Sequence, residues 1–145
     1  MKRYNSLLLV LLAFSLIGNG NLFNKNQESR TELLEHEVSS FKTLTQNTLT
    51  GLKQDNSALL KQTYSNLQSN PPFGSRSFAN TEQVLNKYEQ IFKDSMNDKQ
   101  GSHSQEIAQL EKIFKILVQL SEKEKISEKD VKSSFTKIDA ILAVE

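Results

Sequence analysis

The sequence predicts an all-α fold, in which a long first helix and three shorter helices form an antiparallel bundle behind an N-terminal signal segment. Apolar residues recur at helical spacing in four stretches, and no stretch alternates as a half-buried strand does. Short turn-forming segments separate these stretches, which favours antiparallel neighbours. We therefore divide the chain into a signal segment at residues 1–20, a flexible lead-in at residues 21–28 and a bundle domain at residues 29–145, with a Pro/Gly loop at residues 70–79.

The N-terminal segment has the layout of a secretory signal peptide. Lys2 and Arg3 form a positive start, and residues 7–17 (LLLVLLAFSLI) are almost wholly apolar. Small residues then end the segment at Gly20. The apolar run is about a dozen residues long, whereas a transmembrane helix needs roughly 17 to 25. We expect cleavage after Gly20, so that the mature chain starts at Asn21. The alternative is an uncleaved anchor that holds the chain to a membrane.

The composition argues against nucleic-acid binding and against thiol chemistry. The chain has 18 Lys and Arg against 17 Asp and Glu, so no strong field attracts it to nucleic acid, and we expect membrane contact only through an uncleaved N-terminal segment. It has no cysteine, so it can form neither a disulfide nor a thiol nucleophile. We expect a periplasmic or secreted protein that packing or assembly stabilises; the alternative is a membrane-anchored protein facing the periplasm or the exterior.

The first helix is the longest and least regular element that the sequence predicts. Ser29 lies three residues before Glu32, the spacing of a capping box, so we expect the helix to begin there. Its apolar stripe weakens around Gly51, where the pattern fits one helix of about forty residues or two helices that meet. We favour one long helix. The stripe consists of Leu34, Val38, Phe41, Leu44, Leu49, Leu52, Leu59, Leu60, Tyr64 and Leu67.

Proline ends this helix, because Pro71 and Pro72 cannot donate to the helical hydrogen-bond ladder. A second helix is expected from Asn80, and turn-forming residues stop it between Asn97 and Gly101. Its apolar face consists of Val84, Leu85, Tyr88, Ile91 and Phe92.

The third predicted helix is the most hydrophobic, and we expect it at the centre of the bundle. Ser102 or Ser104 is its expected cap. Residues 121–125 are then either a mixed-charge linker or a solvated helical turn. Ser127 and Asp130 repeat the capping spacing, and a fourth helix follows almost to the C-terminus. The apolar faces of these two helices are Ile107, Leu110, Ile113, Phe114, Leu117 and Leu120, and then Val131, Phe135, Ile138 and Leu142.

No pattern in the sequence indicates catalysis or a bound cofactor. His36 and His103 are the two histidines, and neither lies in a His-Glu-x-x-His metal motif. Residues 94–105 fail as a calcium loop, because Lys99 occupies the position that requires glycine. No nucleophile elbow, phosphate-binding loop or dinucleotide fingerprint occurs. We expect a protein that is not an enzyme and that has no metal site and no cofactor.

The remaining hypothesis is binding to a protein partner or to a second copy of the chain. Polar residues interrupt the apolar stripe of the first helix, which suits a partly exposed surface. The candidate surface consists of Thr45, Thr48, Leu52, Asp55 and Leu59. One alternative is an anchored envelope component of a larger sensory, motility or secretion assembly. A second is a small-ligand-binding bundle, with a pocket lined by Tyr88, Phe92, Phe114 and Phe135.

Overall fold

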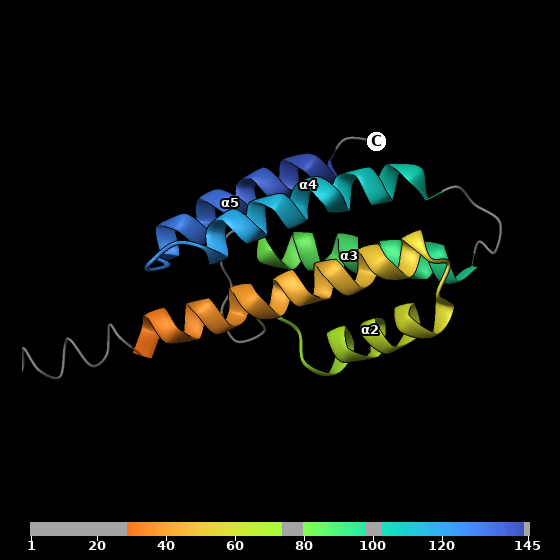
Figure 1. The fold of residues 1–145 in the computed structure, drawn as a ribbon, viewed down its shortest axis with the longest axis horizontal. Coiled ribbons are helices and arrows are strands. Elements are labelled where there is room, and N and C mark those ends of the chain that lie inside the picture. The colour runs from red at the N-terminus through yellow and green to blue at the C-terminus, as the bar shows by residue number, and fades with distance from the viewer. Residues whose placement is uncertain (1–28, 74–79, 98–102, 144–145) are drawn as a thin grey trace, which may run out of the picture. The chain divides into compact units, whose positions relative to one another are not determined.

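The fold is all-helical in the part of the chain that the structure describes, as the sequence predicts (Figure 1). The computed structural model describes residues 29–73, 80–97 and 103–143. The predicted signal segment and lead-in, residues 1–28, lie outside the described residues. The chain divides into two units, of which the second, Leu34–Glu145, contains the packed core. The packing below is that of this unit.

The described residues form five helices, one more than the sequence predicts. The first helix covers residues 29–53. The others are α2 (Ser57–Ser69), α3 (Thr81–Asn97), α4 (Ser104–Ser121) and α5 (Glu128–Leu142).

The prediction of one first helix of about forty residues is wrong, because the chain turns back just after residue 53. The Asn56 N–H donates to the Gly51 carbonyl oxygen at 2.8 Å. The Asp55 N–H donates to the Leu52 carbonyl oxygen at 3.3 Å. These two bonds, with Asp55 at a φ of 49°, form a Schellman motif. Asn56 then caps α2, since its side chain accepts the Leu59 N–H at 3.0 Å.

The helix α2 runs antiparallel to the first helix. Close to the turn, Leu60 approaches the first helix so tightly that a Cβ atom at Gly51 would lie 2.6 Å from its Cδ2. At the other end of this hairpin, the Glu37 carboxylate accepts the backbone N–H of Phe73. The first helix and α2 therefore form an antiparallel helical hairpin (Figure 1).

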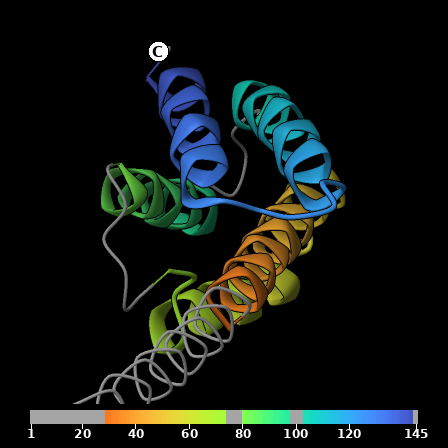
Figure 2. The same ribbon diagram turned by 90° about the vertical axis from the view of Figure 1, so that its left-hand side faces the viewer.

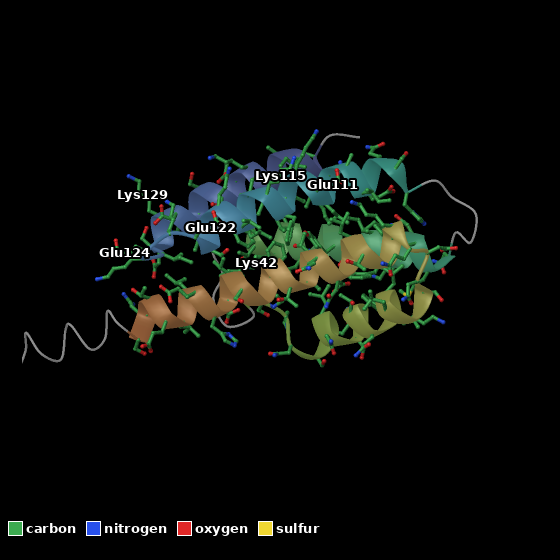
Figure 3. All side chains as sticks on the ribbon, viewed as in Figure 1. Lys42, Glu111, Lys115, Glu122, Glu124 and Lys129 are labelled. Atoms are coloured by element: carbon green, nitrogen blue, oxygen red, sulfur yellow. The ribbon has the colours of Figure 1, made fainter. Side chains whose placement is uncertain are left out.

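The helix α4 is also antiparallel to the first helix. Lys42 donates to the Ser121 hydroxyl at 3.1 Å, and Lys53 pairs with Glu111 at 2.7 Å. Residues nearer the C-terminus of the first helix thus contact residues nearer the N-terminus of α4. Figure 3 labels Lys42 on the first helix and Glu111 on α4. The Lys53–Glu111 pair is exposed, so it marks the alignment of the two helices more than it stabilises it.

The helices α2 and α3 are also antiparallel neighbours. The Gln68 side-chain amide donates to Glu89 at 2.9 Å. The rings of Tyr64 and Phe92 lie 5.5 Å apart. Gln68 follows Tyr64 in α2, whereas Glu89 precedes Phe92 in α3. The two helices are therefore antiparallel, as predicted.

A short connection joins α4 to α5. Residues 122–127 are not helical, so the mixed-charge stretch is a linker. The predicted capping box is confirmed, with the Ser127 side chain accepting the Asp130 N–H and the Asp130 side chain accepting the Ser127 N–H. At the open end of this pair, the Gln109 amide donates to the Ile141 carbonyl oxygen at 3.1 Å.

The helix α4 is amphipathic and not enclosed, so the expectation that it lies at the centre is wrong. Glu111, Lys112 and Lys115 are exposed on its outer side. Its buried residues are Leu110, Ile113, Leu117 and Leu120. The first helix buries more positions than α4, because α2 covers part of its surface. Its buried residues in this unit are Leu34, Val38, Phe41, Leu44, Thr45, Thr48, Gly51 and Leu52.

Candidate functional site

A surface groove with a volume of about 460 Å³ lies between the first helix and α2. The side chains of Leu44 and Leu67 are buried and form its floor, whereas most of the residues along its sides are polar and at least partly exposed. No Asp, Glu, Lys or Arg lines it. The lining residues are His36, Ser39, Ser40, Thr43, Leu44, Asn47, Thr63, Asn66, Leu67, Ser69, Asn70 and Pro72.

Short hydroxyl side chains keep this groove open. The Thr43 hydroxyl donates to the carbonyl oxygen of Ser39 in the preceding turn of its helix, at 3.0 Å. The Thr63 hydroxyl donates to the Leu59 carbonyl oxygen in the same way, at 2.7 Å. These side chains therefore satisfy their donors locally and do not reach across to the facing helix. The space between the two helices remains available.

Two asparagines on the facing helices have free hydrogen-bonding capacity. Asn47 is half-buried on the first helix, and Asn66 is exposed on α2. Neither side chain has a hydrogen bond within the part of the chain that the structure describes. Each amide offers two donors and one acceptor. The groove can thus bind a polar ligand from both walls.

The histidines do not assemble a catalytic or metal site in the described residues. His36 lies at one end of the groove, and no hydrogen bond joins it to the groove serines described by the structure. His103 occupies the cap position of α4 without a side-chain capping bond. The predicted cap Ser104 is instead the first helical residue, and Ser102 lies outside the described residues. No group of three potential ligands among His, Cys, Asp and Glu occurs in the described residues.

The predicted interaction residues do not form one exposed surface. Thr45 and Thr48 are fully buried, and Leu52 is also in the core. Asp55 is exposed on the turn after the first helix, and Leu59 is partly exposed at the start of α2. The surface proposed from the interrupted stripe is therefore corrected: most of it is internal packing between helices.

Hydrogen bonds explain why Thr45 and Thr48 are tolerated in the core. The Thr48 hydroxyl donates to the Leu44 carbonyl oxygen at 2.7 Å, and the Thr45 hydroxyl donates to the Phe41 carbonyl oxygen at 2.9 Å. The Thr45 oxygen also lies 2.8 Å from the Tyr88 hydroxyl. Since Thr45 uses its only proton on Phe41, Tyr88 is the donor in this second bond. Burial raises the pKa of the Tyr88 phenol, and the bond to Thr45 opposes that rise.

Three of the four aromatic residues predicted to line a ligand pocket form core packing. Tyr88, Phe92 and Phe135 are fully buried, and Phe114 is half-buried. The ring of Phe41 lies 5.1 Å from that of Tyr88 and 5.2 Å from that of Phe135. These distances are typical of packed aromatic pairs, which leaves no space for a ligand between them. None of the four residues lines the groove.

The apolar pattern alone does not predict the groove, because it continues past Gly51 and makes the two walls resemble one continuous helix. The signal was present in the spacing of His36, Thr43 and Asn47, which share a helical face that also includes Ser39 and Ser40. That polar face acquires a facing wall only if the chain turns back after residue 53. The four polar residues at 54–57 (QDNS) indicate such a turn.

No protein family, curated protein or solved structure that we compared matches this chain. Among the described helices, none is both long and apolar enough to span a bilayer. The large hydrophobic side chain that is exposed in the described residues is Leu33, which precedes the packed unit Leu34–Glu145.

Proposed function

We propose that the chain is exported and acts by binding a protein partner, without catalysis. The observation that carries the proposal is the groove between the first helix and α2, in which the Asn47 and Asn66 amides face a ligand-sized space without protein partners among the described residues. The apolar core of the described unit is covered, so polar recognition suits this surface better than apolar association.

The order of residues at the N-terminus supports export. A positive start, a short apolar run and small residues ending at Gly20 are typical of a cleaved secretory signal. The anchored alternative keeps this segment and places the bundle on a membrane surface. The N-terminal residue of the native protein distinguishes the two. A mature start at Asn21 in soluble extract supports a free exported protein, and an intact Met1 in membranes supports the anchored component of a larger assembly.

Site-specific cross-linking in the native host tests partner binding. A photoreactive amino acid at Asn66 is compared with one at Lys132, an exposed residue of α5. Figures 1 and 2 place α2 and α5 on opposite sides of the packed unit. We expect a discrete protein adduct from Asn66 and none from Lys132. Equal labelling from both positions, or none from either, would contradict specific binding at the groove.

Native mass spectrometry of the protein isolated from its own host distinguishes the small-ligand alternative from binding of a protein partner. A retained small molecule lost on substitution of Asn47 supports that alternative. A pocket lined by Tyr88, Phe92, Phe114 and Phe135 has no support, because three of these rings, Tyr88, Phe92 and Phe135, pack against other aromatic rings in the core.

A further inference from the structure

We infer that the groove binds an uncharged segment of a partner protein in an extended conformation. The inference rests on the proposed function, since it names the chemistry of the partner that the groove accepts. It depends on three properties of the groove: its length, its free amides and its lack of charged lining residues.

The groove has the length of a short extended peptide. Its lining on the first helix runs from His36 to Asn47, which corresponds to roughly 17 Å at 1.5 Å per helical residue. An extended chain advances about 3.3 Å per residue, so about five residues fit along this wall. The volume of about 460 Å³ suits a segment of a few small residues better than a whole helix.

The hydrogen-bonding groups of the groove match an extended backbone. Asn47 and Asn66 each offer both donors and an acceptor, and they come from opposite walls. An extended peptide presents free N–H and C=O groups along its length, whereas a helical segment has already paired most of its own. The exposed Thr43 hydroxyl has used its donor within its own helix, so its oxygen remains as an acceptor. A backbone N–H group of a peptide can satisfy it.

The absence of acidic, lysine and arginine side chains from the lining selects against a charged segment. A charged side chain placed against the buried floor of the groove would lose water without gaining an opposite charge from Asp, Glu, Lys or Arg, which is costly. Leu44 and Leu67 instead provide a small apolar floor. We therefore expect small polar or apolar side chains at the central positions of the bound segment.

Affinity selection with the purified mature chain tests this inference. The probe is a random library of octapeptides that are acetylated and amidated, so that their termini carry no charge. We expect enrichment of peptides without Asp, Glu, Lys or Arg at the central positions. Asn66→Asp should weaken binding of an enriched peptide at least about tenfold, because it replaces the amide donors with a charge. Asn86→Asp, an equivalent change at an exposed site on α3, should leave binding unchanged.

A second peptide set tests recognition of the backbone. Methylation of alternate backbone nitrogens removes N–H donors without changing the side chains, and we expect it to abolish binding. Equal binding of the methylated peptide, equal loss in Asn86→Asp, or binding of neutral oligosaccharides such as maltohexaose in place of peptides would each overturn the inference. An Asn66 cross-link to a host protein without any enriched peptide would also overturn it, while the proposed function would stand.

Discussion

The buried Thr45–Tyr88 pair shows how a polar residue on an apolar stripe can belong to the core. Thr45 donates to the Phe41 carbonyl oxygen and accepts from Tyr88, so both hydroxyl groups are satisfied without water. The sequence pattern records only that threonine interrupts the stripe. It does not show that a tyrosine from α3 supplies the partner, because that contact joins residues far apart in the chain.

This pair predicts an asymmetric mutational result. Tyr88→Phe removes the donor and leaves Thr45 bonded to Phe41, so we expect a loss of about 1 kcal/mol in the free energy of unfolding. Thr45→Val leaves the buried Tyr88 hydroxyl without a partner, and we expect a larger loss, roughly 1–3 kcal/mol. The double variant should cost no more than Thr45→Val alone. Urea denaturation measures all three, and additive effects would contradict the hydrogen bond.

Phe73 combines a buried ring with an uncommon backbone conformation. Its φ is 60°, in the left-handed region that disfavours side chains, yet its ring packs edge-on against Phe135 at 5.1 Å. The N–H bond to Glu37 fixes its backbone. Ring burial of several kcal/mol outweighs a conformational cost of about 1 kcal/mol, which explains why phenylalanine is accommodated.

At position 73 we expect glycine to give a more stable protein than alanine, which is the reverse of the usual order. Phe73→Ala and Phe73→Gly both lose the ring, at roughly 3–5 kcal/mol. Glycine relieves the left-handed strain that alanine keeps, so we expect Phe73→Gly to be about 1 kcal/mol more stable than Phe73→Ala. Thermal and urea unfolding of both variants provide the measurement. A less stable glycine variant would show that this backbone conformation is not retained in solution.

Among the helices, the main error of the sequence prediction is the helix boundary after residue 53. The helix does not break at Gly51, where the apolar stripe weakens, because Gly51 is helical and allows the close approach of Leu60. The turn depends on Asp55 and Asn56, which favour left-handed and capping conformations. The capping box at the start of α5 was predictable because both of its partners lie within four consecutive residues.

The Schellman motif predicts a stabilising substitution at Asp55. This residue occupies the left-handed position that glycine usually fills, and its side chain is exposed. Asp55→Gly should raise the free energy of unfolding by up to about 1 kcal/mol. Asp55→Ala is the control, because it keeps the strain, and it should not stabilise the protein. The midpoint of urea unfolding distinguishes the two; stabilisation by alanine would point to a cause other than backbone conformation.

Gly51 predicts the opposite effect of a helix-favouring change. Gly51→Ala gains up to about 1 kcal/mol of helix propensity, but its Cβ would lie 2.6 Å from Leu60 Cδ2 and 2.7 Å from Leu60 Cγ. Overpacking of this kind costs roughly 1–3 kcal/mol, so the net effect should be destabilising. Hydrogen exchange should show a larger loss of protection in α2 than in α5. Undiminished protection of α2 would mean that Leu60 moves aside freely.

In the packed unit as a whole, apolar periodicity predicts the helical class, and turn and capping residues predict the starts of α3, α4 and α5 to within a residue or so. The antiparallel arrangement follows from short connections, and it is present in the helix pairs described above. The groove was not predictable in the same way. It is formed by Asn47 and Asn66 on two helices that the sequence pattern had joined into one. Recognition of that turn would have placed the two polar rows opposite each other.

Two titrating groups should limit the pH range in which the packed unit is most stable. Hydrogen bonds from Lys123 and Ser127 lower the pKa of Asp130 to about 2 from 3.8. A lowered carboxyl pKa stabilises the folded state above pH 4, and that contribution is lost as the pH falls from about 4 toward 2. Burial raises the pKa of Tyr88 above its ordinary value. A raised tyrosine pKa stabilises the folded state below about pH 10, and that contribution is lost as the pH rises further.

Unfolding of the wild type and of two variants, measured from pH 2 to 12, should therefore assign the acid limit to Asp130 and the alkaline limit to Tyr88. Above about pH 10 the wild type should lose up to about 1.4 kcal/mol more stability per pH unit than Tyr88→Phe, because the unfolded tyrosine releases its proton while the buried one keeps it. Between pH 4 and 2 the wild type should lose more stability than Asp130→Asn, which cannot titrate. The lysines contribute equally to both proteins in the alkaline comparison, so the difference isolates Tyr88. Parallel curves above pH 10 would mean that the phenol is not buried in solution, and that the Thr45–Tyr88 bond does not hold the first helix to α3.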